Sequence, residues 1–199
     1  MLALPRGGVP VGAEIAKALG TPLDVFVVRK LGTPGQEELA FGALASGGTR
    51  ILDPELIRYF SLPQETIQRI TEREQRELER RELLYRKGRD PLLVRNRTVI
   101  VVDDGLATGA SMLAAAKALR EQGAAHIVVA VPVGARQSVE ELQRIVDHVT
   151  YLATPHPFNA VGIWYDDFSE VTDEEVQRIL EATASDLPAG CTCAQSSGG

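Results

Sequence analysis

The chain has 199 residues, of which 44% are apolar, and a formal net charge of −6. This length and apolar content suffice to bury one substantial core, so we expect a single domain with excursions. The acidic balance argues against general nucleic-acid binding, and the lack of a long apolar run or a signal-peptide pattern predicts a soluble cytoplasmic protein with no membrane contact.

A glycine-rich turn stands close to the start of the chain. Residues 1–4 form a short apolar stub that leads into the sequence PRGG, and residues 11–19 have helical character. A strand, a glycine turn and a helix N-terminus together favour phosphate binding, because unpaired backbone N–H groups face the ligand. Arg6 would add a cation to this turn. The alternative is a tight turn with a solvated arginine.

Residues 23–28 (LDVFVV) are predicted to form a second buried strand, which Arg29 and Lys30 follow. Two cations at the carboxyl end of a parallel strand can face an anionic ligand, and the alternative is that they are simply solvated. The next stretch is rich in turn-forming residues, where we expect a short hairpin of residues 41–45 with residues 50–52.

Residues 63–87 are strongly helical and heavily charged. A thin apolar stripe runs along this predicted helix and consists of Ile67, Ile70, Leu78 and Tyr85. We interpret the segment as a solvated helix with internal ion pairs. A homodimer contact is the minority interpretation.

Residues 99–111 (VIVVDDGLATGAS) carry the strongest functional signal. The four apolar residues are typical of a strand buried on both faces of a parallel sheet, and Asp103 and Asp104 follow where such a sheet binds ligands. The loop after them leads into an Ala-rich helix that ends before Gly123, so its N-terminus can bind phosphate. Together these features suit a ribose 5-phosphate. Acid pairs at strand ends also occur as metal sites, phospho-acceptors or helix N-caps.

This stretch resembles the phosphoribosyl-diphosphate (PRPP) motif of type I phosphoribosyltransferases: four apolar residues, two acids and a small-residue loop with Thr-Gly. The resemblance implies an α/β fold with a doubly wound, mostly parallel, Rossmann-like sheet, a small hood and a flexible-loop and helical excursion. It also implies that Asp103 and Asp104 accept hydrogen bonds from the ribose hydroxyls. The implied 5-phosphate-binding residues are Gly105, Leu106, Ala107, Thr108, Gly109, Ala110 and Ser111.

The N-terminal motifs share this resemblance. PRGG is similar to the family's diphosphate loop, where the peptide before the basic residue is often cis, so the Pro5–Arg6 bond is a candidate. The VRK ending resembles the Arg-Lys pair of orotate- and adenine-type enzymes. Related chains carry a helix and a fuller strand before PRGG, so either this start is truncated or the fold uses a stub. The implied diphosphate-binding residues are Arg6, Gly7, Gly8, Arg29 and Lys30, and the implied catalytic residues are Arg6, Lys30, Asp103 and Asp104, with Mg²⁺ as cofactor.

The family keeps a mobile catalytic loop between its second and third core strands. Residues 32–48 are the candidate for that loop, within an excursion of about residues 31–95. A loop that closes over the substrate would exclude water from a reactive cation.

Residues 126–133 and 148–152 are predicted as further parallel strands, and the crossovers between strands predict a doubly wound sheet. Between these two strands, Ser138 and Glu141 have the spacing of a capping box at a helix start.

Residues 154–170 break the pattern with prolines, aromatic residues and a second acid pair. Aromatic rings beside a phosphate site suit stacking on a planar base, and the alternative is an irregular cap whose rings are core. The segment resembles the family's hood, which binds the acceptor. Its VGIWYDD run resembles the VG…D element of hypoxanthine–guanine enzymes, which would put Asp166 near the magnesium ion. The candidate acceptor-binding residues are Phe158, Asn159, Val161, Trp164 and Tyr165.

Residues 171–184 are predicted to form an amphipathic helix with Thr172 as N-cap and Glu175 at the capping-box position. Residues 185–199 are expected to be a disordered tail, which leaves one domain over residues 1–184. The CxC of Cys191 and Cys193 is interpreted as incidental reduced thiols, because a zinc site needs more ligands.

The resemblance implies a magnesium-dependent transfer of the 5-phosphoribosyl group from PRPP to a nucleobase-like, nitrogenous acceptor in nucleotide metabolism. Ala107 stands where purine-salvage members often carry an acid, and alanine cannot act as a general base. We hypothesise that the acceptor ionises by itself or that a hood residue or substrate group takes the proton. One alternative is a PRPP-binding regulator without turnover. Another is a receiver-like phospho-acceptor domain, whose acid cluster and following lysine we do not find.

Overall fold

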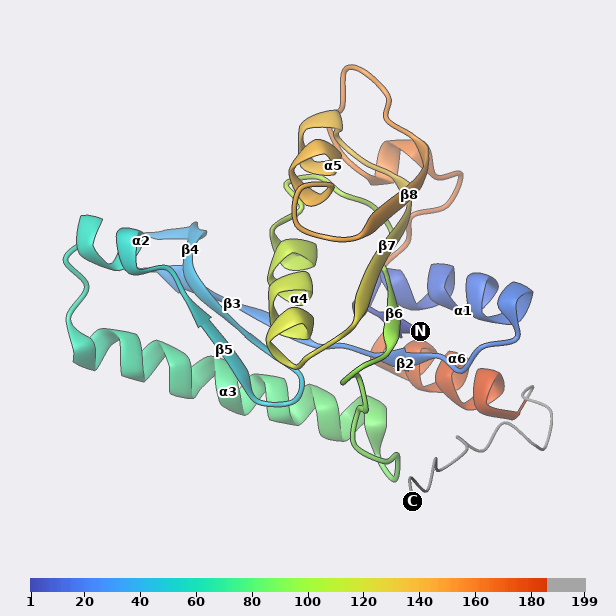
Figure 1. Cartoon of the computed structure of the whole chain (residues 1–199), viewed down its shortest axis with the longest axis horizontal. Coiled ribbons are helices and arrows are strands. Elements are labelled where there is room, and N and C mark those ends of the chain that lie inside the picture. The colour runs from blue at the N-terminus through green and yellow to red at the C-terminus, as the bar shows by residue number, and fades with distance from the viewer. Residues whose placement is uncertain (186–199) are drawn as a thin grey trace.

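A five-stranded parallel sheet organises the computed structural model, which describes residues 1–185 (Figure 1). Its strands lie in the order β2-β1-β6-β7-β8, and every neighbouring pair is parallel. They are β1 (Leu2–Ala3), β2 (Asp24–Val25), β6 (Thr98–Val102), β7 (His126–Val133) and β8 (His148–Ala153). The sheet confirms the predicted α/β class.

Helices cover both faces of this sheet, as a doubly wound fold requires. They are α1 (Gly8–Leu19) and α6 (Asp173–Ser185), which pack together on one face, and α4 (Ala110–Glu121) and α5 (Arg136–Leu142) on the other (Figure 1). Each face has its own buried cluster, one containing Val101 and Met112 and the other Val25 and Leu180. Strand β1 contributes to both cores, with Leu2 in the first cluster and Ala3 in the second.

A second, antiparallel sheet extends away from the first (Figure 1). It consists of β3 (Val28–Thr33), β4 (Gln36–Ala45) and β5 (Thr49–Leu52), and α2 (Pro54–Tyr59) and α3 (Gln64–Arg86) follow it. The predicted hairpin is confirmed, with a longer first strand than expected and with β3 as a third strand. The candidate mobile loop therefore lies largely within β4 and the turns beside it, in an arm that also includes α2 and α3.

The predicted strand over residues 23–28 is wrong in its second half. Only Asp24 and Val25 join the parallel sheet, and the chain then changes sheets. The reason is a pair of hydrogen bonds between Val27 and Ser46: the Val27 N–H donates to the Ser46 hydroxyl at 2.9 Å, and the Ser46 N–H donates to the Val27 carbonyl at 2.8 Å. These bonds start the antiparallel sheet.

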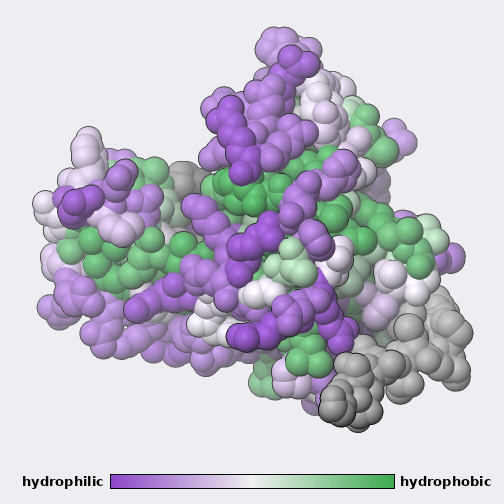
Figure 2. Space-filling model, viewed as in Figure 1, coloured by the Kyte–Doolittle hydropathy of each residue, from purple (hydrophilic) through white to green (hydrophobic). Residues whose placement is uncertain are grey.

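The long charged helix α3 agrees closely with its prediction. Its four stripe residues are buried, and Figure 2 shows hydrophilic residues along its outer side. Among the described residues, no helix combines the length and the apolar character needed to cross a membrane.

Two predicted helix caps have different outcomes. Thr172 is confirmed as a cap, because its hydroxyl accepts the Glu175 N–H at 3.1 Å. The capping box at Ser138 is wrong: α5 begins two residues earlier, so Ser138 lies inside the first turn. Its hydroxyl donates instead to the carbonyl of Ala107 at 2.7 Å.

Residues 186–199 lie outside the described residues. The expected tail falls there except for Ser185, which ends α6. The expectations for Cys191 and Cys193 also fall in this part of the chain and stay predictions.

Candidate functional site

The loops after β1 and β6 meet because these two strands are neighbours in the sheet. A Cβ atom on Gly7 would lie 1.9 Å from Oδ2 of Asp104, and one on Gly8 would lie 2.7 Å from the Val102 carbonyl oxygen. Only glycine permits this approach. The Pro5–Arg6 peptide bond is cis, as expected. The structure therefore brings the PRGG turn and the acid pair into contact.

The acid pair is poorly solvated. Burial raises the pKa of Asp103 to about 8, and the neighbouring Asp104 carboxylate adds to the rise, although the Asp104 N–H donates to Asp103 at 2.9 Å. Burial also raises the pKa of Asp104. Carboxylates in such surroundings gain most from hydroxyl donors or a cation, which would stabilise the charged form.

A hollow of about 220 Å³ lies between the acid pair and the start of α4. Its lining comprises residues 103–112 and Val161, so it contains every predicted 5-phosphate-binding residue. Gly109 has a φ of 70° and turns the loop into α4, whose first-turn N–H groups have no acceptor within the helix. These N–H groups and the exposed hydroxyls of Thr108 and Ser111 can bind an anion.

Leu106 and Ala107 are tied to β7 and α5 by hydrogen bonds that fix the shape of this hollow. The Leu106 side chain is buried, and its N–H donates to the Val133 carbonyl at 2.9 Å, so that N–H is already used. The Ser138 hydroxyl holds the Ala107 carbonyl. The contact between Ser138 and the loop was missed because a Ser/Glu spacing indicates capping, whereas the loop lies 31 residues away.

A second cavity, of about 530 Å³, lies between the PRGG turn and the segment after β8. Its lining residues are Arg6, Gly7, Pro10, Val11, Asp104, Tyr165, Asp167, Phe168, Ser169, Glu170 and Val171. Tyr165 and Phe168 place their ring centroids 5.2 Å apart, and the Tyr165 hydroxyl donates to the Asp104 carbonyl at 2.5 Å. The cavity has room for a planar ring beside the acid pair.

Of the five predicted acceptor-binding residues, Tyr165 alone lines this cavity. Val161 lines the smaller hollow beside Gly105. Phe158 is half-buried, Asn159 is exposed and Trp164 is 46% exposed, so the segment is not a packed core of rings. Phe168 was missed, although an aromatic residue just after the second acid pair was a usable signal.

Arg6 reaches the same cavity but is already paired. Its guanidinium contacts the carboxylate of Glu170, and a second carboxylate, of Asp173, lies 3.6 Å away. Arg6 is the cation of the PRGG turn and lines this cavity, so an anion bound there would compete with these two carboxylates for its guanidinium.

Arg29 and Lys30 do not occupy the predicted position at the end of a parallel strand. Both lie within β3, for the reason given above. Arg29 donates to Glu74 through Nε (2.9 Å) and Nη2 (2.6 Å), and Lys30 lines a separate hollow of about 600 Å³ between α4 and the antiparallel sheet. Their part in diphosphate binding stays a prediction.

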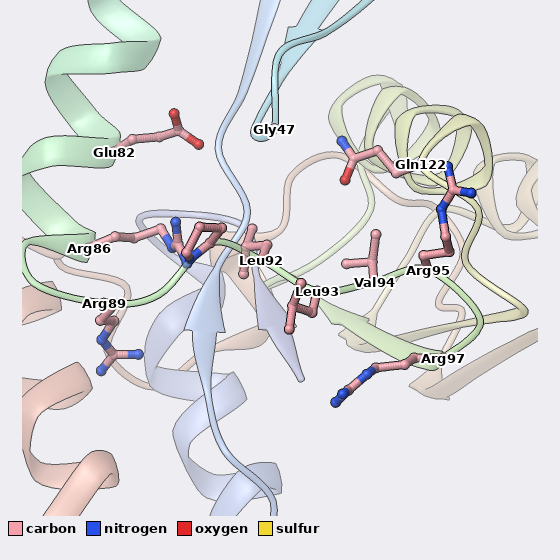
Figure 3. Close-up of a pocket in the computed structure, with 11 residues that line it drawn as sticks. Gly47, Glu82, Arg86, Arg89, Leu92, Leu93, Val94, Arg95, Arg97 and Gln122 are labelled. Atoms are coloured by element: carbon pink, nitrogen blue, oxygen red, sulfur yellow. The ribbon is translucent and has the colours of Figure 1, made fainter. Parts of the chain in front are cut away.

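A further cavity, of about 810 Å³, lies at the far end of β6 and is rich in arginine (Figure 3). Arg86 is paired with Asp24, Arg89 donates to two backbone carbonyls, and Gln122 donates to a third. Figure 3 shows that these side chains point in different directions. They join α3, α4 and β2 to their surroundings, so this cavity is not the candidate site.

The residues fit a magnesium ion that is carried in with a phosphate-bearing ligand. Within residues 1–185, no cluster of three or more His, Cys, Asp or Glu side chains could hold an ion by itself. Magnesium is usually bound by one or two carboxylates together with substrate phosphates. Asp104 and Asp167 line the cavity of about 530 Å³, whereas the predicted Asp166 is not among its lining residues.

A family model described as "Phosphoribosyl transferase domain" matches residues 1–166. Two proteins of Mycobacterium tuberculosis (strains CDC 1551 / Oshkosh and H37Rv), each provisionally named a phosphoribosyl transferase, are 44% identical over 187 residues. The match covers 94% of this chain and 42% of each relative, so the chain spans less than half the length of these relatives. The crystal structure of TT1426 from Thermus thermophilus is 46% identical, covers 90% of this chain and 85% of that chain, and superposes with a TM-score of 0.79.

Proposed function

Because the chain belongs to the phosphoribosyl transferase domain family, we propose that it transfers the 5-phosphoribosyl group of PRPP to a nitrogenous, nucleobase-like acceptor and releases diphosphate. One observation carries this proposal: the glycine turn after β1 packs against the acid pair after β6, between a phosphate-sized hollow and a larger cavity. This arrangement offers separate places for a 5-phosphate and for a planar acceptor.

Each loop would hold one part of PRPP. Asp103 and Asp104 would accept hydrogen bonds from the ribose hydroxyls, and these donors would stabilise the charged carboxylates that burial disfavours. Each such bond to a charged acceptor is worth about 1.5–3 kcal/mol. The first turn of α4 would hold the 5-phosphate, and Arg6 would face the diphosphate. A bound magnesium ion, held by Asp104 and Asp167 with the ligand's own oxygens, would supply positive charge to the leaving group.

Catalysis would consist mainly of positioning and charge stabilisation. The bond between the ribose and the diphosphate would break through an oxocarbenium-like transition state. The acid pair and the exclusion of water would favour this transition state. No carboxyl group stands at Ala107 to take the acceptor's proton. Burial and the nearby aspartates raise the pKa of Tyr165 to about 12, so this phenol stays protonated near neutral pH. We therefore propose an acceptor that ionises by itself.

A PRPP-binding regulator without turnover is the second candidate. It is favoured by the pairing of Arg6 with Glu170 and by the lack of an ionisable group at Ala107. Such a protein would use the same phosphate hollow and acid pair without needing an acceptor.

Calorimetric titration with PRPP, with and without magnesium, tests the proposal. We expect the parent to bind PRPP in a magnesium-dependent manner. The Kd of Asp103→Asn/Asp104→Asn should be at least tenfold weaker, because the loss of even one charge-assisted contact has an effect of that size. Asp90→Asn/Glu140→Gln removes two exposed charges as a matched control and should bind like the parent.

Release of diphosphate across a panel of nitrogenous acceptors then separates the two candidates. Turnover with any acceptor supports the transferase, and binding without release across the panel supports the regulator. If the parent does not bind PRPP, both are wrong.

A further inference from the structure

Arg6 pairs with two carboxylates, of which one is fixed by a further hydrogen bond and the other is exposed to solvent. Glu170 contacts one terminal nitrogen of the guanidinium, and Oδ1 of Asp173 lies 3.6 Å from the other. Glu170 precedes α6 and Asp173 is its first residue, so both carboxylates are more than 160 residues away from Arg6 in sequence. The guanidinium that is proposed to meet the diphosphate is therefore already paired with carboxylates in the free protein.

Asp173 is fixed in place. It is the first residue of α6, and its Oδ1 accepts a hydrogen bond of 2.5 Å from the hydroxyl of Tyr85. Tyr85 is a buried residue of α3, and burial together with this hydrogen bond raises its pKa to about 12, so it remains a donor. Asp173 is thus supported by α3 and α6 at once.

Glu170 has no comparable support. Its side chain is 77% exposed, and it lies in an irregular segment three residues before α6. An exposed ion pair contributes little to stability, so Glu170 can leave Arg6 at little cost. Asp104, Asp167 and Glu170 all line the same cavity, so an incoming polyanion would be repelled by Glu170 if it stayed.

From this asymmetry we propose that Glu170 occupies Arg6 in place of the diphosphate, whereas Asp173, braced by Tyr85, orients Arg6 for the ligand. Carboxylate and phosphate oxygens compete for the same guanidinium donors. A guanidinium carries five N–H donors, so Arg6 can keep Asp173 while it exchanges Glu170 for a phosphate oxygen. The inference rests on the proposed binding of PRPP at this site, and it makes Glu170 an autoinhibitory residue and Asp173 a positioning residue.

The two roles predict opposite effects on binding. With inorganic diphosphate and PRPP as probes in the presence of magnesium, Glu170→Gln should lower the Kd about three- to fivefold. Asp173→Asn and Tyr85→Phe should raise it. Glu174→Gln removes the same charge from an exposed position of α6 and should leave the Kd unchanged.

A second measurement probes Arg6 directly in the absence of ligand. Modification of Arg6 by phenylglyoxal, followed by mass spectrometry, should be faster in Glu170→Gln than in Glu174→Gln or the parent, because the guanidinium is released. Thermal unfolding of each variant shows whether Asp173→Asn and Tyr85→Phe remain folded. Glu170 is exposed, so its variant decides the outcome even if those two unfold.

The outcomes separate this inference from the function on which it rests. If the parent binds PRPP and Asp103→Asn/Asp104→Asn does not, but Glu170→Gln binds no more tightly than Glu174→Gln, the inference alone is wrong. Unchanged phenylglyoxal reactivity in Glu170→Gln would also overturn it. A parent that binds neither PRPP nor diphosphate overturns the proposed function and this inference together.

Discussion

Asp103 carries an ionisation penalty in the free protein. Its pKa rises to about 8 because its carboxyl group is buried and the Asp104 carboxylate lies beside it. Near neutral pH, folding therefore places a carboxyl group where its charged form is disfavoured, at a cost that a ligand with hydroxyl groups or a cation would offset. Binding sites commonly hold such residues at the expense of stability.

Replacing Asp103 by asparagine should therefore change the pH dependence of stability. The pKa of Asp103 in the folded protein lies above its unfolded value of about 4, so the protonated group stabilises the folded state of the parent. This contribution to the free energy of unfolding is complete below pH 4 and is lost as the pH rises through 8. The substituted side chain would not ionise, and it keeps an oxygen for the Asp104 N–H. In urea unfolding from pH 4 to pH 9, the free energy of unfolding of Asp103→Asn should rise relative to that of the parent. The change across this range should exceed the ~0.5 kcal/mol typical of surface substitutions. The exposed Asp90→Asn should show no such trend, and a pH-independent difference for Asp103→Asn would contradict the assignment.

At the scale of elements, Arg29 joins the antiparallel sheet to α3. Its guanidinium makes two hydrogen bonds to Glu74, whose side chain is only 8% exposed and which also contacts Arg73. A buried carboxylate is costly without partners, so this arginine supports the packing of β3 on α3. That structural role competes with the diphosphate-binding role expected from the sequence.

Arg29→Gln should lower the free energy of unfolding by about 1–3 kcal/mol, since Oε2 of Glu74 loses both hydrogen bonds from Arg29 while Oε1 keeps its bond from Arg73. Arg76→Gln, at an exposed position of the same helix, should stay within about 0.5 kcal/mol of the parent. Chemical denaturation measures both. If Arg29 is purely structural, PRPP binding of the folded variant should match the parent; a large loss of PRPP affinity at unchanged stability would instead support the diphosphate role.

At the scale of the whole molecule, the antiparallel arm and the parallel sheet share a core. One buried cluster contains Leu31 and Phe41 of the arm, Leu78 of α3, and Val25 and Leu180 of the main fold. Because these residues pack in one continuous cluster, we expect residues 1–185 to unfold as one cooperative unit, as in small single domains. The expected single domain over residues 1–184 depends on this coupling.

Two leucines of α3 provide the test. Leu78 is 1% exposed, so Leu78→Ala should lower the free energy of the single unfolding transition by about 2–5 kcal/mol, whereas Leu83, which is 70% exposed, should tolerate alanine within about 0.5 kcal/mol. Circular dichroism and the fluorescence of Trp164 should report coincident transitions. Two separate transitions, or a Leu83→Ala variant as unstable as Leu78→Ala, would show that the arm is an independent unit or that α3 packs against a partner.

Patterns between close sequence neighbours identified much of the fold and the centre of the candidate site. The apolar run over residues 126–133 has the same bounds as β7, and the stripe of α3 is buried as predicted. The acid pair and its loop lie together because one strand, one turn and one helix start hold them. In each case a short stretch of chain contains the whole physical cause, whether burial, a left-handed turn or a cap.

Only the tertiary structure decided which partner each charged side chain has. Arg29 contacts a residue 45 positions away, Arg6 one 164 positions away, and Ser138 a carbonyl 31 positions back. The change of sheets at Val27 depends likewise on Ser46. Hydrophobic periodicity cannot specify such contacts, because they depend on how separately formed elements pack. The sequence by itself thus determined the class of fold and the loops of the candidate site. Packing decided which cations lie near these loops, because a guanidinium pairs with the carboxylates that folding brings close to it.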